Sequence, residues 1–373
     1  MTAALSADRG TLAELQELQE FEELEGLEGL EEVVEHRTGL QATRVLHAPD
    51  GRGFYWWQRP GTGRTGPLTA PAAHLVPHLG PETGAALLVT PRRVGDGLVH
   101  RTDGSASVAA WLRDFRPQAR QLAGHSLVSA ARALRELHRV PVPEGAGFGA
   151  PPGIVRLRAW VAGQSESRSR ALSSWGAART DRLLDWAADL TVPSGSDGSD
   201  GPDGSDGSDG SDGSDGSDGS DGSDGSDGSD GSHGSGGAAA RAGFSLLHGW
   251  ASVGALIPPL SRGRVALLTG EDLAVGRPEL DLGWLLGDLA ELTWAAPPYD
   301  CTELLGVVPA AYGPGLDPVR LGRAAVLRIV THMQDFATFQ GWHDELLDYI
   351  AFTAELIDEE GRRAVSPLAQ GVS

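Results

Sequence analysis

Two adjacent acids, Glu271 and Asp272, follow closely on an apolar run at residues 265–268. Carboxylates placed just beyond a buried strand can ligate a hard cation such as Mg²⁺, and they can also take a proton from a hydroxyl group. A loop at residues 248–256, His-Gly-Trp-Ala-Ser-Val-Gly-Ala-Leu, precedes this run. The two acids could equally be solvated loop residues, and both interpretations stay open at this point.

The loop at residues 248–256 resembles the His-Gly-Asp-x-x-x-x-Asn loop of the aminoglycoside phosphotransferases, the small-molecule branch of the protein-kinase-like fold. In that family the Asp orients and deprotonates the acceptor hydroxyl, and the Asn helps to hold Mg²⁺. Here Trp250 stands at the position of the Asp and Ala255 at that of the Asn. Neither side chain can accept a proton or ligate a metal. The resemblance implies that His248 is a structural residue of the loop.

The segment that follows is similar to the family in its order of features. An apolar run, an acidic loop, a Gly-x-Pro turn and an Asp-Leu pair occur within residues 265–282. The resemblance implies a short buried strand at 265–268 and a structural role for Asp281, which would hydrogen-bond the loop carrying His248. The family's metal-binding Asp falls at Thr269. A hydroxyl is a poor Mg²⁺ ligand, so Glu271 and Asp272 are the candidate substitutes for catalysis and metal binding.

The phosphate-binding lysine of kinase-like enzymes is missing. Residues 54–60, Phe-Tyr-Trp-Trp-Gln-Arg-Pro, look like the family's third strand, with Gln58 at the lysine position. The chain contains no lysine at all, since its 30 basic residues are all arginine. Arg59 would point to the face opposite Gln58, because side chains alternate along a strand. The base, the metal ligands and the lysine are therefore all replaced, which is typical of a pseudokinase.

The resemblance implies an α+β fold, the two-lobed protein-kinase-like (aminoglycoside phosphotransferase) fold, with a small β-rich N-lobe and a larger helical C-lobe. We expect an acidic Leu/Glu-rich arm at 1–39, helical over 11–36. The N-lobe is assigned to 40–105 and the first part of the C-lobe to 106–193. A Ser-Asp-Gly repeat insertion at 194–237 cannot bury a core and is predicted to be disordered. The rest of the C-lobe, with the degenerate catalytic and metal loops, covers 238–365, and 366–373 form a tail.

Individual elements can be predicted from apolar spacing and turn residues. Strands are expected at 43–47, 54–59 and 85–90, with a hairpin turn at 49–53. Helices are expected at 126–138, 178–190, 283–292, 318–339 and 344–357. His138 is interpreted as a helix C-terminal residue, because the helix dipole favours it there.

Composition narrows the function classes. The net charge of −21 comes mainly from twelve Asp at 194–237 and ten Glu at 11–36, so the remainder is nearly neutral. That balance predicts no nucleic-acid partner and no anionic membrane surface. The single cysteine excludes a disulfide framework, and neither a signal peptide nor a membrane-length apolar run is evident. We expect a cytoplasmic protein.

Three functional hypotheses follow. The first is a degenerate phosphotransferase-like protein that binds a small molecule, peptide or protein without normal kinase activity. Residues 12–18 are similar to segments of lanthipeptide leader peptides, which places it in a natural-product or modified-peptide pathway. The second is an active ATP- and Mg²⁺-dependent phosphotransferase that acts on a small-molecule or peptide hydroxyl through relocated acids. The third is an adaptor that recruits a basic partner through its acidic segments.

Overall fold

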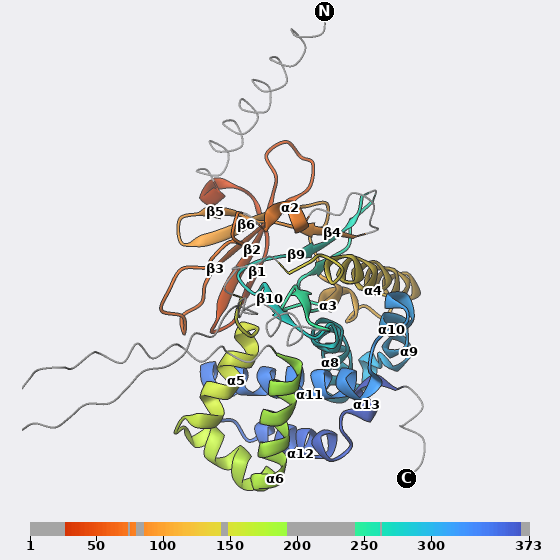
Figure 1. Ribbon diagram of the computed structural model, residues 1–373. Coiled ribbons are helices and arrows are strands. Elements are labelled where there is room, and N and C mark those ends of the chain that lie inside the picture. Colours follow the sequence, from red (N-terminus) through yellow and green to blue (C-terminus); the bar gives the residue numbers. More distant parts are fainter. Residues whose placement is uncertain are drawn as a thin grey trace, which may run out of the picture. The chain divides into compact units, whose positions relative to one another are not determined.

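The computed structural model describes residues 27–73, 75–79, 86–142, 148–191, 243–261 and 263–366. Most of the predicted acidic arm and the whole Ser-Asp-Gly repeat lie outside these ranges. Within them, the chain forms a strand-rich lobe followed by a helical lobe (Figure 1). This is the two-lobed α+β architecture that the sequence predicts.

The first lobe is built on a five-stranded sheet in the order β1-β2-β3-β6-β5. The strands are β1 (Glu32–Arg37), β2 (Gln41–His47), β3 (Phe54–Pro60), β5 (Arg92–Val94) and β6 (Gly97–Thr102), and every pairing is antiparallel. The central strand β3 places Tyr55 and Trp57 in one buried cluster and Phe54 and Trp56 in another. Both faces of the sheet are therefore covered, which explains the aromatic run.

The predicted helix over 11–36 is wrong at its C-terminal end. After a short 3₁₀ turn, η1 (Leu27–Gly29), the residues Glu32–Arg37 form the edge strand β1 and pair with β2. The β-branched pair Val33 and Val34 suits a strand better than a helix. The strand-rich lobe consequently begins about eight residues before the predicted boundary at residue 40.

A second sheet joins an early strand to two strands from the second half of the chain. It has the order β4-β9-β8, with β4 (Ala86–Val89) parallel to β9 (Val265–Leu268) and β8 (Leu256–Ile257) antiparallel to it. A two-stranded ladder joins β7 (Ser245–Leu247) to β10 (Ala274–Gly276). Strand β4 thus pairs with β9, from much later in the chain, and is not part of the five-stranded sheet.

The helical lobe consists of long helices joined by shorter ones. Its members are α4 (Pro117–Leu137), α5 (Pro152–Ala162), α6 (Glu166–Leu190), α8 (Glu279–Ala295), α9 (Thr302–Leu305), α10 (Val307–Tyr312), α11 (Pro318–Phe339), α12 (Glu345–Asp358) and α13 (Arg362–Val365). The short α2 (Val76–Leu79), α3 (Val108–Trp111) and η2 (Pro297–Tyr299) complete the set. None of the helices in the described ranges is long and apolar enough to cross a bilayer.

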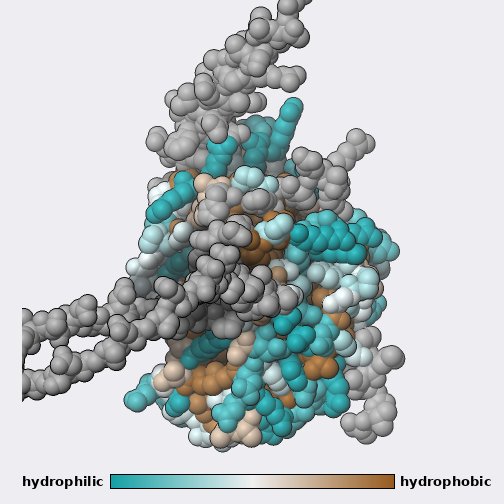
Figure 2. All heavy atoms as spheres, viewed as in Figure 1, coloured by the Kyte–Doolittle hydropathy of each residue, from teal (hydrophilic) through white to brown (hydrophobic). Residues whose placement is uncertain are grey.

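The main core lies between α8 and α11. Gly283 and Gly287 face α11, where an added Cβ would overlap the Ala324 side chain or lie 2.7 Å from the Ala325 carbonyl oxygen. Glycine therefore permits the close approach of the two helices. On the face drawn in Figure 2, hydrophilic residues dominate, and apolar residues gather over the helical lobe.

Two predicted helices are longer than expected. Helix α4 begins at Pro117, because proline is well suited to the first helical turn, and α6 begins at Glu166 after the N-cap Ser165. Gly176 has a φ of 74° within α6, so two helical segments meet there in a kink. The apolar spacing at 178–190 reflects only the second segment.

Candidate functional site

The loop after β7 is held from below by Asp281, in the first turn of α8. Its carboxylate accepts hydrogen bonds from the backbone N–H groups of His248 and Gly249, at 2.7 and 2.9 Å. The His248 ring is buried and donates from Nε2 to the carbonyl of Leu268 at 2.9 Å. Burial lowers the pKa of His248, so the imidazole is neutral and cross-links the loop to β9. These contacts make His248 a packing residue with no open proton-accepting nitrogen.

Trp250 occupies the catalytic position implied by the resemblance and is fixed there on several sides. The guanidinium carbons of Arg156 and Arg328 lie 5.3 and 5.7 Å from its ring centroid. Trp284 meets it edge to face at 6.2 Å. Cation–π contacts of this kind are worth about 0.5–2 kcal/mol each. The indole is thus a built part of the cleft wall.

The two metal positions implied by the resemblance offer no ligand. Ala255 presents a methyl group, and its backbone N–H donates to Ser252 Oγ at 3.2 Å. Thr269 is buried, and its hydroxyl donates to the Val89 carbonyl at 2.7 Å, so it is used within the β4–β9 pairing. No group of three or more potential metal-ligating side chains occurs among the described residues. Ala255 and Thr269 therefore do not supply the carboxylate or amide oxygens that Mg²⁺ prefers.

Glu271 is already engaged across the cleft. Arg64, in the loop after β3, pairs with both of its carboxylate oxygens, one contact measuring 2.6 Å between Nη2 and Oε2. The backbone N–H of Thr69 donates to the same carboxylate at 3.1 Å. Glu271 therefore connects the segment after β9 to the loop after β3 in the strand-rich lobe. Both of its oxygens are bonded to Arg64, without a metal ion.

Asp272 is different, because it lines the cleft and its carboxylate has no hydrogen bond or ion pair among the described residues, although Arg156 and Arg64 lie near enough to lower its pKa in part. Its carbonyl approaches Gly249 so closely that a Cβ there would overlap it, and Gly249 has a φ of +80°. Burial and the nearby charge of Glu271 raise the pKa of Asp272 to about 7. A carboxyl group that titrates near neutral pH suits general acid–base chemistry. Asp272 is the one predicted site acid whose geometry leaves it available.

The raised pKa of Asp272 predicts a pH-dependent stability. The group's pKa is higher in the folded than in the unfolded protein, so its contribution is most favourable below about pH 4 and is lost as pH rises towards 7. Asp272→Asn removes this titration. We expect the variant to be more stable than the parent by up to about 4 kcal/mol at pH 8 and nearly equal to it at pH 4, because a shift of one pKa unit corresponds to about 1.4 kcal/mol. Urea unfolding at the two pH values measures this, and an equal difference at both would contradict it.

The remaining predicted residue, Gln58 on β3, also lines the cleft. Together with the turn between β1 and β2 and the segments around Trp250 and Asp272, it encloses a cavity of about 420 Å³. Arg59 lies on the other face, where its guanidinium sits over Trp57 at 5.1 Å. The strand-to-strand turn that covers the cavity is at residues 38–40, whereas the turn at 49–53 does not line it.

Two groups of contacts were not predicted from the sequence, those of His138 and those around Trp250. His138 is buried, and its Nε2 donates to Asp281 at 3.0 Å while Nδ1 accepts from the Tyr312 hydroxyl. His138 therefore ends α4 and also connects it to α8, whose Asp281 holds the loop. The second group is the arginine pair around Trp250, from α5 and α11. The Leu-His helix end at 137–138 was visible in the sequence, but nothing near Arg156 or Arg328 marks them as neighbours of residue 250.

Comparisons with solved structures concern the fold. The chain is similar to the solved structure of the amicoumacin kinase hAmiN in complex with AMP-PNP, Ca²⁺ and Ami, with a TM-score of 0.51 and 10% identity over 96% of both chains. An aminoglycoside phosphotransferase from Streptomyces rimosus matches at a TM-score of 0.39 and 17% identity, covering 83% of this chain and 97% of that one. An ethanolamine kinase from Plasmodium vivax matches at 0.45 and 10%, over 90% and 82%.

Comparisons of the sequence found one family match, and it covers only a short segment of the chain. The collagen triple helix repeat family matches residues 192–245, where glycine recurs every third residue as Ser-Asp-Gly. That segment has only Pro193 and Pro202, far below the proline content of collagen, so the match reflects glycine spacing. No curated protein sequence matches the chain. By its structure, the chain has the two-lobed kinase-like fold of the amicoumacin kinase.

Proposed function

We propose that this chain is a degenerate phosphotransferase that binds a ligand in the cleft without normal kinase activity. The observation that carries the proposal is Trp250, fixed between Arg156 and Arg328 at the position of the catalytic base. An indole N–H can donate but cannot take a proton from a hydroxyl group. Loss of general base action alone costs roughly 10²–10⁴ in rate.

The chemistry of the cleft fits a ligand bound without Mg²⁺. Thr269 and Glu271 are occupied by Val89 and Arg64, so no carboxylate pair is free to share a cation with phosphates. The cavity of about 420 Å³ is within the size range of small-molecule sites. Arg113 lines it as well, and no ion pair is found for its side chain among the described residues. A nucleotide or another polar small molecule is a suitable ligand.

Thermal unfolding in the presence of ATP tests the proposal. A ligand that binds only the native state raises the midpoint, by an amount that corresponds to about 2.7 kcal/mol at a hundredfold excess over Kd. We expect any rise with ATP to be the same with and without Mg²⁺, and no turnover in either condition. A rise that requires Mg²⁺ would contradict the non-catalytic assignment. Trp250→Asp places a carboxylate at the position that the resemblance assigns to the base. Trp342→Phe, outside the cleft, is the control variant.

A second function is favoured by one specific observation. Asp272 lines the cleft next to Gly249, with its pKa raised to about 7, and could deprotonate an acceptor hydroxyl from this new position. The chain would then be an active ATP-dependent phosphotransferase on a small-molecule or peptide hydroxyl. Of the two relocated acids, Glu271 is paired with Arg64, so Asp272 is the candidate base in this alternative.

Asp272→Asn separates the two functions. If the chain is active, this change should lower turnover of ATP by at least about a hundredfold, because the amide cannot act as a base. The exposed Asp344→Asn serves as the control and should leave any turnover unchanged. Turnover that survives in Asp272→Asn would exclude Asp272 as the base.

The third function, an adaptor for a basic partner, depends on acidic segments that lie largely outside the described residues. Deletion of residues 1–26 would test it by partner capture.

A further inference from the structure

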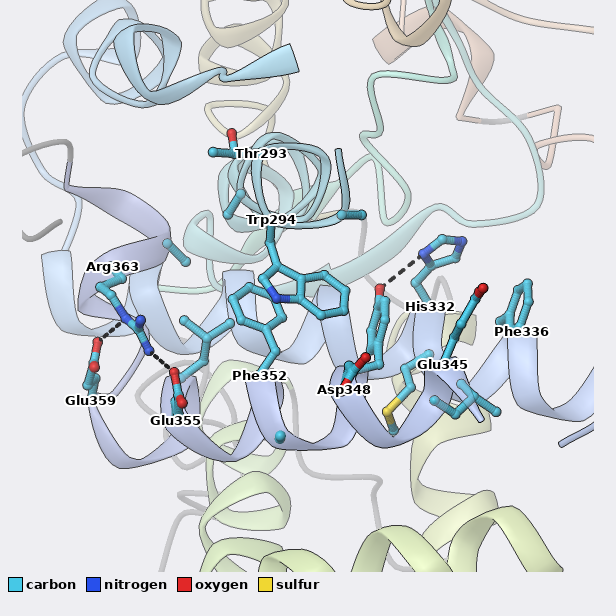
Figure 3. Close-up of a pocket in the computed structure, with 18 residues that line it drawn as sticks. Thr293, Trp294, His332, Phe336, Glu345, Asp348, Phe352, Glu355, Glu359 and Arg363 are labelled. Carbon is cyan, nitrogen blue, oxygen red and sulfur yellow. Dashed lines mark hydrogen bonds and ion pairs between the residues drawn. The ribbon is translucent and has the colours of Figure 1, made fainter. Parts of the chain in front are cut away.

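A second cavity lies in the helical lobe, away from the cleft. It is a groove of about 1170 Å³ between α8, α11, α12 and α13, and none of its lining residues also lines the cleft. Figure 3 shows the groove with Trp294 projecting from α8 towards α12.

The apolar wall of the groove is aromatic. Trp294 stacks face to face on Phe352, with centroids 4.5 Å apart and an interplanar angle of 1°. Tyr349 meets the same indole edge on at 4.9 Å. Phe336, on α11, is 42% exposed at the end of the groove. Partly exposed aromatic rings gathered around a hollow are typical of a binding surface.

The rim of the groove is acidic. Four lining residues are carboxylates (Glu345, Asp348, Glu355 and Glu359), and Arg363 is the only arginine in the lining. Arg363 holds Glu355 and Glu359 at 2.7 and 2.8 Å, and these pairs lie at one end (Figure 3). Among the described residues no ion pair involves Asp348, which faces the middle of the groove. The groove therefore carries uncompensated negative charge.

The aromatic faces have no cation of their own. Every cation–π contact found within the described residues involves rings elsewhere, such as Trp57, Trp250 and Trp342. A ring face carries partial negative charge and attracts ammonium groups, and a carboxylate nearby adds to this attraction. An anionic ligand such as a nucleotide would be repelled by the rim.

We propose that this groove binds an organic cation with an aryl or alkyl body, its ammonium group near Asp348 and its apolar body against the Trp294–Phe352 stack. The apolar body of the ligand is buried against the aromatic rings, which favours binding. The Asp348 carboxylate, which has no ion pair among the described residues, favours a ligand with a positive charge. The ligand class is thereby distinct from anything that the arginine-lined cleft would take.

Titration of the full-length chain with benzyltrimethylammonium, followed by ligand-observed NMR, tests the proposal. We expect saturable binding, and weaker binding of the uncharged isostere in which carbon replaces the nitrogen. Asp348→Asn should weaken binding of the cation about fivefold, and Phe352→Leu should weaken binding of both compounds. Asp181→Asn, an exposed acid on α6 outside the groove, is the matched control and should have no effect.

Three outcomes would overturn the proposal. The isostere could bind as well as the cation, Asp348→Asn could leave the affinity unchanged, or no saturation could appear. A second copy of the chain is the competing occupant of the same surface. Sedimentation would then show a dimer that Phe336→Ser dissociates, and that result would also replace the organic cation as the ligand.

Discussion

Replacing Arg328 by methionine is expected to destabilise the fold by about 3–5 kcal/mol. The Arg328 guanidinium is buried and pairs with Asp288 at 2.5 Å between Nη2 and Oδ1. Asp288 is itself buried, and its other oxygen accepts from the Val253 backbone N–H at 2.8 Å. Methionine fills much of the volume but leaves the carboxylate without its counter-charge. Removing one partner of a buried pair costs more than the pair contributes, because the other charge remains desolvated.

The effect of Arg328→Met should depend on pH. Burial raises the pKa of Asp288, and Arg328 is the main group that opposes the rise. Without the arginine the pKa of Asp288 rises further, so the variant loses stability as pH increases and regains part of it in acid. Urea unfolding at pH 5 and pH 8 should therefore give a smaller deficit at pH 5. An equal deficit at both would show that the charge of Asp288 is not the cause.

Two further variants separate charge from volume. Asp288→Asn in the Arg328→Met background keeps an acceptor for the Val253 N–H and removes the stranded charge, so it should recover part of the loss. Arg182→Met is the surface control, since Arg182 is half-exposed and lies 3.8 Å from Asp358. An exposed pair of this kind is worth about 0–1 kcal/mol. A loss in the control as large as in Arg328→Met would refute the argument from burial.

The ion pair also bears on the cleft. Arg328 contacts Trp250 as well as Asp288, and Asp288 holds the backbone of the same loop at Val253. The tryptophan is therefore supported by the network that fixes the loop. These contacts hold the Trp250 side chain and the backbone of its loop in one connected set of buried groups.

The sequence predicts local features better than it predicts neighbours. The strand at 265–268 and the helix at 318–339 match the structure because their apolar patterns are long or dense enough to decide the element. The strand at 32–37 was mistaken for helix, because a run of Glu continues across it and its partner strand is what selects the conformation. The pairing of β4 with β9 joins residues about 180 positions apart, which no local pattern encodes.

The same distinction holds in the candidate site. The substitutions at 58, 250, 255 and 269 can be recognised from a motif, since the motif fixes spacing along the chain. The engagement of Glu271 by Arg64 could not be predicted, because the two residues lie 207 positions apart. The same is true of the arginines that flank Trp250. Long-range contacts depend on tertiary packing, and a single sequence contains no direct record of them.

Asp281→Asn is expected to cost about 3 kcal/mol or more, because one side chain serves three donors. Its carboxylate accepts from the backbone of His248 and Gly249 and from the His138 ring, at 2.7 to 3.0 Å. An asparagine offers one oxygen in place of two, and its NH₂ group faces a donor. At least one buried N–H is then left unpaired, and such groups cost about 1–3 kcal/mol each.

The loss at Asp281 should appear in two measurements. Urea unfolding gives the stability, and the indole N–H signal of Trp250 in a ¹H–¹⁵N NMR spectrum, assigned by its loss in Trp250→Phe because the chain has ten tryptophans, reports the environment of the residue that follows Gly249. Asp185→Asn, an exposed acid on α6, is the control and should change stability by less than about 0.5 kcal/mol. If Asp281→Asn unfolded no more easily than Asp185→Asn, the loop would not depend on this carboxylate. The fixed position of Trp250 would then have to come from Arg156 and Arg328 alone, and the shared anchoring of loop and helix α8 would be refuted.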